Sequence, residues 1–129
     1  MAVYKHFYEL PAYKACRSFR KEVCALAKSF PKEEKFLLTQ QLLDAARSIT
    51  ANIAEGFGRF HYQENIQFCR QSRGSLSETM EHLITSYDEN YIDKETLEKY
   101  NTKYKECLKE LNGYVKYLKT MKAHPIINN

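Results

Sequence analysis

The chain contains few residues that would interrupt a helix. Its 129 residues include only four glycines and three prolines, and we interpret these as lying near the ends of apolar-periodic runs. Apolar residues recur at every third or fourth position, whereas the alternation that is typical of strands is absent. The sequence therefore predicts an all-α protein with helices over residues 11–29, 39–55, 62–90 and 94–121.

Four amphipathic helices with short links favour an antiparallel up-down-up-down bundle, formed by one domain over residues 1–129. Pro31 marks the first break, Gly56 and Gly58 suit the C-terminal cap of the second helix, and Asp93 suits the N-cap of the fourth. We leave residues 1–10 unassigned. The predicted core positions are Cys16, Phe19, Val23, Leu26 and Ala27; Leu38, Leu42, Ala46, Ile49 and Ile53; Ile66, Cys69, Leu76, Met80, Leu83, Tyr87 and Tyr91; and Leu97, Tyr100, Tyr104, Leu108, Leu111, Val115 and Leu118.

The second predicted helix carries small and polar residues beside its apolar stripe. Ser48, Asn52 and Glu55 form a row that indicates close helix contacts or a polar interface. Helical phase places Arg73 on the apolar stripe of the third helix, where an unpaired charge would be costly. We expect Arg73 either to pair with Glu55 or to face a neighbouring subunit, and we expect Gly74 to permit a close helix approach.

The residues of an enzyme or metal site are not evident in the sequence. Glu78 and His82 lie four residues apart without a matching pair elsewhere, so we interpret them as a solvated pair. The four cysteines lack metal-ligand spacing, and no stretch has the apolar length of a signal peptide or a membrane span. We therefore expect a cytoplasmic protein with reduced thiols, without enzymatic activity, cofactor, metal or membrane contact.

Basic residues provide a stronger indication of function, although the net charge is only +4. On the first helix, four cations fall within about 60° of one another and form a ridge opposite the apolar stripe. A second row lies on the fourth helix, and Tyr8, Tyr13 and Tyr62 either stack on bases or belong to the core. Such rows either follow a phosphate backbone or serve as solvated faces. The first-helix ridge is Lys14, Arg17, Lys21 and Lys28, and the fourth-helix row is Lys105, Lys109, Lys116 and Lys119.

Two segments carry a resemblance to a known family. The segments S-I-T-A-N-I-A-E-G at 48–56 and R-G-S-L-S-E at 73–78 resemble the four-helix bundle family encoded in intervening sequences of bacterial 23S rRNA genes. The resemblance implies subunits of a barrel-shaped homopentamer. It extends to the accessory variability determinant of diversity-generating retroelements, which works with a reverse transcriptase and binds nucleic acid through a basic surface. The positions that it assigns to helix packing or subunit contact are Asn52, Glu55, Gly56, Gly74, Ser75 and Leu76.

Our leading hypothesis is an oligomeric, non-enzymatic protein that binds nucleic acid, with a preference for RNA. The alternative is an interaction scaffold for a polymerase or a ribosome-associated partner, without direct nucleic-acid contact. The residues expected to contact phosphates are Lys14, Arg17, Lys21, Lys28, Arg47, Lys105, Lys109 and Lys116.

Overall fold

The computed structural model describes residues 4–124, and all the regular elements within them are helices joined by short links. The long helices are α1 (Pro11–Ala27), α2 (Leu38–Gly58), α3 (Tyr62–Asp88) and α4 (Lys94–Ala123), and the short 3-10 turns are η1 (Phe7–Glu9) and η2 (Lys32–Glu34). None of these helices is both long and apolar enough to cross a membrane. The all-α prediction is confirmed, and each predicted helix is present with ends shifted by at most three residues.

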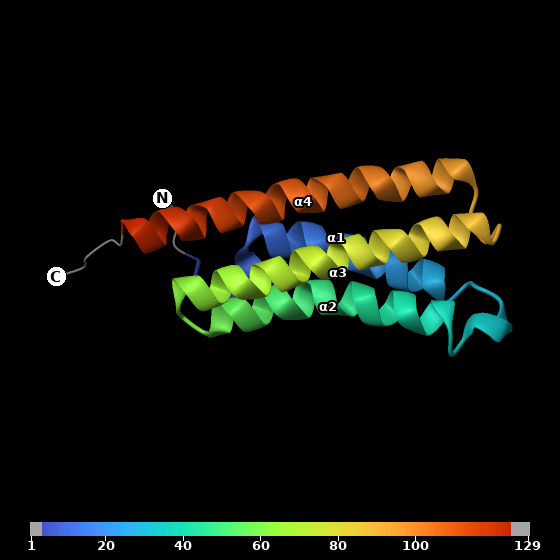
Figure 1. Cartoon of the computed structure of the whole chain (residues 1–129), viewed down its shortest axis with the longest axis horizontal. Coiled ribbons are helices and arrows are strands. Elements are labelled where there is room, and N and C mark those ends of the chain that lie inside the picture. Colours follow the sequence, from blue (N-terminus) through green and yellow to red (C-terminus); the bar gives the residue numbers. More distant parts are fainter. Residues whose placement is uncertain (1–3, 125–129) are drawn as a thin grey trace.

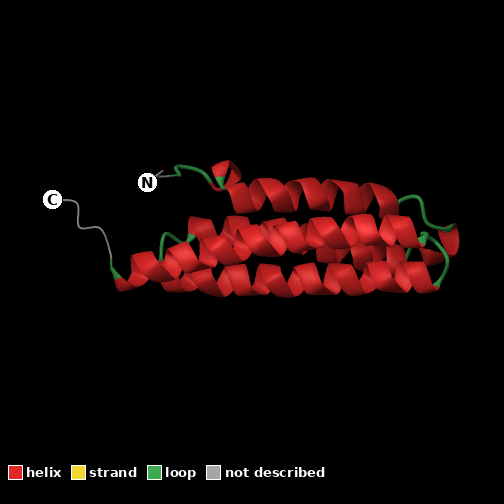
Figure 2. Cartoon of the chain, turned by 90° about the horizontal axis from the view of Figure 1, so that it is seen from above, coloured by secondary structure: helices red, strands yellow, loops and turns green. Residues whose placement is uncertain are grey.

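The four long helices form a bundle in which each packs against two others. Helix α1 contacts α2 and α4, and α3 contacts the same two, whereas neither diagonal pair is in contact within the described residues. Successive helices run in opposite directions (Figure 1), and the view from above shows the same lengthwise alignment (Figure 2). This is the predicted antiparallel up-down-up-down bundle.

The core follows the predicted apolar stripes, with deviations near the end of α3. Tyr87 is 37% exposed, because its large ring sits in the last turn of α3, where it is only partly covered. Tyr91 lies beyond that helix and packs against Phe30 with ring centroids 5.4 Å apart. Asn90, with a φ of 64°, ends the run of helical backbone. Side chains with no more than 2% exposure come from all four helices and include Cys16, Phe19, Val23, Leu42, Ile49, Ile53, Cys69, Leu76, Leu83 and Leu111.

The seam between α2 and α3 is built from small and polar residues. Ser72 Oγ donates a hydrogen bond to the carbonyl oxygen of Ile49 at 2.7 Å, and Ser75 Oγ donates to Ser48 Oγ at 2.9 Å. Asn52 Nδ2 donates to the carbonyl oxygen of Ser48 at 2.9 Å. Small side chains let the two backbones approach, and these bonds satisfy the polar groups that become buried there. The close contact predicted from the polar row is therefore present.

Gly56 belongs to this seam and does not cap a helix. A Cβ at this position would lie 2.8 Å from both Asn65 Oδ1 and Phe68 Cβ, so α3 leaves no room for a side chain. The prediction that Gly56 and Gly58 stop α2 is wrong at Gly56, because the helix continues to Gly58. The left-handed residue at this turn is Phe60, with a φ of 53°.

Gly74 and Gly113 lie inside α3 and α4, which corrects the expectation that glycines fall near helix ends. A Cβ at either position would have no heavy atom within 4 Å, apart from the helix's own backbone and chain neighbours. Gly74 therefore does not permit a close helix approach within the bundle.

The helices differ in length, and this difference opens one end of the bundle. Helix α1 has 17 residues and α4 has 30, which correspond to roughly 26 Å and 45 Å at 1.5 Å per residue. Cys107 of α4 donates to the carbonyl oxygen of Ala15, so the part of α4 after about residue 111 extends past the start of α1 (Figure 1). There the place of α1 is taken by residues 4–10, including η1.

Candidate nucleic-acid interface

Four cations line a shallow groove on the surface between α1 and α2. Arg20 and Lys21 come from α1, Lys28 is the C-cap residue of that helix, and Arg47 comes from α2. Cys24 and Ala25 complete the lining of this groove, whose volume is about 490 Å³. Three of the predicted contact residues are thus brought together, and Arg20 joins them. We refer to Arg20, Lys21, Lys28 and Arg47 as the basic groove.

Arg20 was missing from the sequence prediction because its phase places it between the charged ridge and the apolar stripe. Its Nη1 donates a hydrogen bond to Thr50 Oγ1 at 2.8 Å, which ties the guanidinium across the α1–α2 contact. This bond occupies one donor and leaves the other N–H donors of the fork without a partner among the described residues. The sequence did contain a signal for Arg20, because the helical phase of this basic residue directs it toward a neighbouring helix.

Lys14 and Arg17 continue the basic surface along α1 toward its N-terminus. Both are exposed, and neither forms an ion pair with another described residue. The same holds for Lys21, Lys28 and Arg47. The ridge predicted on α1 and the basic groove therefore form one continuous strip of positive charge.

Within the described residues, no acidic side chain of α1 or α2 forms an ion pair with this strip. Glu22 turns to α4, where it accepts a hydrogen bond from Lys103. Asp44 accepts a bond from a glutamine four residues before it in α2, and Glu55 pairs with Arg59 at 2.8 Å. The lining of the basic groove contains no acidic side chain, and clustered cations of this kind attract anionic chains.

The predicted row on α4 lies on a different face. Lys105, Lys109 and Lys116 are exposed and occupy the side of α4 opposite Cys107 and Lys103, which contact α1. The two rows therefore do not follow one strand across a single subunit. A separate shallow groove between α3 and α4 includes Arg70, Lys119 and Lys122 in its lining.

Arg73 does not pair with Glu55, which corrects that prediction. Its Nη1 donates to Asn112 Oδ1 at 3.0 Å, while Glu55 binds Arg59 within α2. Half-buried Arg73 thus bridges α3 to α4, and α2 is not involved. The nearby hydroxyls of Ser77 and Tyr104, 3.4 Å apart, belong to the same α3–α4 contact.

His82 is less solvated than predicted. Its side chain is only 17% exposed, and its Nε2 lies 3.5 Å from Glu78 Oε1. Among residues 4–124 no three His, Cys, Asp or Glu side chains are grouped so that they could hold a metal ion.

The four cysteines are free thiols, three of them buried. Burial raises the pKa of Cys69 to about 12. The hydrogen bond with Cys107, together with burial, raises the pKa of Cys16 far above its usual range. These core thiols therefore stay protonated, and nothing in their surroundings favours a nucleophile.

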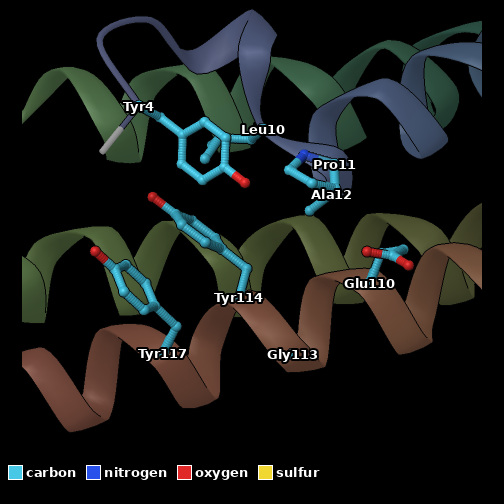
Figure 3. Close-up of a pocket in the computed structure, with 8 residues that line it drawn as sticks. All are labelled: Tyr4, Leu10, Pro11, Ala12, Glu110, Gly113, Tyr114 and Tyr117. Carbon is cyan, nitrogen blue, oxygen red and sulfur yellow. The ribbon is translucent and has the colours of Figure 1, made fainter. Parts of the chain in front are cut away.

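A cleft lined by aromatic side chains occupies the bundle end beyond the start of α1. It consists of two adjoining hollows of about 240 and 300 Å³, which share Tyr4, Leu10, Tyr114 and Tyr117 (Figure 3). Of the tyrosines considered for base stacking, Tyr62 lines this cleft. Tyr8 stacks on His6 and Tyr13 packs edge-on against Phe7, each with ring centroids 5.0 Å apart.

The sequence over residues 8–113 matches the family described as 23S rRNA-intervening sequence protein. The chain belongs to this family. A solved structure of a protein with unknown function from the S23 ribosomal protein family of Bacteroides thetaiotaomicron is 25% identical to this chain. The match covers 81% of this chain and 98% of the other, with a TM-score of 0.74. The comparison with curated proteins finds no match.

The part of the chain matched by the 23S rRNA-intervening sequence protein family contains the whole basic groove. It ends at residue 113, before Tyr114 and Tyr117 of the aromatic cleft. The groove therefore lies within the family's matched region, whereas the cleft is built partly from residues outside it.

Proposed function

We propose that this protein binds RNA without enzymatic activity, through the α1–α2 face. The observation that supports this most directly is that Arg20, Lys21, Lys28 and Arg47 line one groove whose lining contains no acidic side chain. Lys14 and Arg17 extend the positive strip along α1. Guanidinium and ammonium groups spaced along a helix suit the phosphates of a nucleic-acid backbone, whatever its base sequence.

The name of the matched family supports RNA as the ligand, because it ties these proteins to intervening sequences of 23S rRNA. Binding through phosphates releases counterions, so it depends steeply on salt and only weakly on base sequence. Four free thiols agree with a cytoplasmic location, where such an RNA is found.

The test is fluorescence anisotropy with a labelled single-stranded RNA at several salt concentrations. We expect the logarithm of the association constant to fall with the logarithm of salt, by about 0.7 for each phosphate neutralised. The double variant Arg17→Glu and Lys21→Glu should weaken binding by roughly tenfold or more at low salt.

The matched control is Lys105→Glu with Lys109→Glu, which reverses two charges on the opposite side of α4. If both variants weaken binding equally, only net charge matters and the α1–α2 face is not the site. If neither weakens it, the proposal is wrong.

We further propose that the protein acts as a homopentamer, as the resemblance implies. Several copies of one basic strip would bind a long RNA together, and the modest charge of each chain would then suffice.

A second candidate function, an interaction scaffold, is favoured by exposed apolar side chains at the end of the bundle opposite the aromatic cleft. Phe36 and Leu37 are 82% and 59% exposed in the link before α2. Exposed neighbouring apolar residues favour a protein partner, here a polymerase such as a reverse transcriptase or a ribosomal component. Loss of partner capture in Phe36→Ser, with RNA binding unchanged, would support this role.

A further inference from the structure

The aromatic cleft continues the line of α1 and has walls from separate parts of the chain. Tyr4 and Leu10 come from the segment before α1, and Tyr114 and Tyr117 come from the part of α4 that extends past it. The turn between α2 and α3 contributes Phe60, which is 87% exposed at the rim. Figure 3 shows the ring of Tyr4, from the segment before α1, opposite the rings of Tyr114 and Tyr117, which come from α4.

The walls combine flat apolar faces with polar edges. The rings of Tyr114 and Tyr117 are nearly parallel, with centroids 6.2 Å apart and planes 19° apart. Asn65 Nδ2 donates to Tyr114 Oη at 2.9 Å, so the proton of that hydroxyl remains available to an acceptor. Lys5 and His61 lie at the edge of the same cleft. A planar ring with polar edges fits these walls better than an aliphatic chain does.

Gly113 leaves part of the cleft wall without a side chain. It lines the cleft from inside α4, where glycine destabilises a helix relative to alanine. A Cβ there would meet no heavy atom within 4 Å beyond its own helix and neighbours, so packing inside the subunit does not require glycine. A side chain at this position would instead occupy the cleft.

We propose that this cleft binds one unpaired nucleobase of a single strand whose phosphates lie along the α1–α2 basic strip. The inference rests on the proposed RNA-binding function and adds a base-binding subsite to it. The ridge from Lys28 to Lys14 leads along α1 toward the cleft, and Lys5 is placed to meet the phosphate of the bound nucleotide. The two hollows, of about 240 and 300 Å³, lie just below and at the lower limit of the ~300–1,000 Å³ of pockets for drug-sized ligands, so each has room for one ring system.

The test compares Gly113→Leu with the matched control Gly74→Leu, because both place leucine at an open glycine inside a long helix. Thermal unfolding should show that both variants fold at least as stably as the parent protein. With a short single-stranded RNA, Gly113→Leu should lower the affinity by about 5- to 160-fold, the range for one stacked base. Gly74→Leu should leave this affinity unchanged even if Gly74 lies at a subunit contact, because a short RNA reaches one subunit only and Gly74 lines neither the cleft nor the basic groove.

A second probe separates bases from phosphates. A strand of the same length without bases should bind the parent protein and Gly113→Leu equally well. Equal affinities of the two leucine variants for the base-containing RNA would overturn the base-binding subsite.

Failure of the subsite and failure of the proposed function are distinguishable. If Arg17→Glu with Lys21→Glu weakens binding of both strands while Gly113→Leu changes neither, the phosphate strip is supported and the base subsite is not. Adenosine monophosphate, followed by NMR of the tyrosine rings, tests the cleft without the strip. Shifts of the Tyr114 and Tyr117 signals that Gly113→Leu abolishes would support the subsite even if RNA failed to bind, and the absence of shifts would count against it.

Discussion

Gly56 and Gly74 lie in adjacent helices, but only Gly74 has room around it for a side chain. A methyl group at Gly56 would press on Asn65 and Phe68 of α3, whereas one at Gly74 would enter open space. We expect Gly56→Ala to destabilise the protein by about 1–3 kcal/mol through overpacking. Gly74→Ala should stabilise it by about 0.5–1 kcal/mol through helix propensity. Urea unfolding of both variants measures the two free energies.

A stabilising effect of Gly56→Ala would show that the seam between α2 and α3 can open to admit a methyl group. A destabilising effect of Gly74→Ala would show that another molecule covers this face of α3, which points to a subunit contact.

Ionisation of Tyr114 makes the stability of the folded protein depend on pH in the alkaline range. Burial is the main cause that raises the pKa of Tyr114 from 10.0 to about 12. A raised pKa means that its contribution is complete below pH 10 and is lost as pH rises toward 12, because the unfolded chain ionises first. We expect the unfolding midpoint to fall across this range. In Tyr114→Phe the fall should be shallower, and equal slopes for the two proteins would contradict the assignment.

For single residues, the sequence predicted positions on one helix better than contacts between helices. Helical phase correctly placed Lys21 and Lys28 on one surface of α1, because phase depends only on spacing along one helix. It missed Arg20 and gave Arg73 the wrong partner, because a contact also depends on the level and rotation of the neighbouring helix. Asn112 comes within hydrogen-bonding distance of Arg73 because of the position of α4 beside α3, which the spacing of residues along either helix does not reveal.

At the scale of elements, all four helices could be predicted because apolar spacing and the breaks between runs are local signals. The end of α2 was missed because the local preference of Gly56 for a helix end is outweighed by its packing against α3. The row of Ser48, Asn52 and Glu55 predicted close helix contacts or a polar interface without naming the partner, and the structure shows that Ser48 meets α3 whereas Glu55 pairs with Arg59.

Contacts between elements can be tested at Arg73, which joins α3 to α4. A double-mutant cycle of Arg73→Ala and Asn112→Ala should give a coupling energy of about 0.5 kcal/mol, a modest value because the pair is exposed. The matching cycle with Glu55→Ala should give a value near zero, because Glu55 binds Arg59. Chemical denaturation provides the four free energies for each cycle. Coupling of Arg73 to Glu55 alone would contradict the observed arrangement.

At the scale of the molecule, the sequence could not show that the basic rows on α1 and α4 face apart. Lys14 and Lys109 belong to helices in contact, yet they point to different sides because the contact uses Ala15 and Cys107. The aromatic cleft was also missed, since it arises from the unequal lengths of α1 and α4 together with the path of residues 4–10.

Assembly is the property of the whole molecule that most affects RNA binding. Light scattering behind size exclusion should give a mass of five subunits, as the resemblance implies. In that assembly, RNA long enough to reach two basic strips should bind on the order of a hundredfold more tightly than RNA that reaches one. A monomeric mass, with affinity independent of RNA length, would remove the multivalent explanation.

The reactivity of the four cysteines can report on two different events, because their thiols lie in two different environments. Cys24 lines the basic groove and is half-buried, whereas Cys16, Cys69 and Cys107 are closed inside the bundle. An alkylating reagent should reach Cys24 in the native protein, and ligand lying in the groove should slow that reaction. The other three thiols become reactive only when the helices separate, so a single labelling time course records surface occupancy in its first phase and opening of the bundle in its later one.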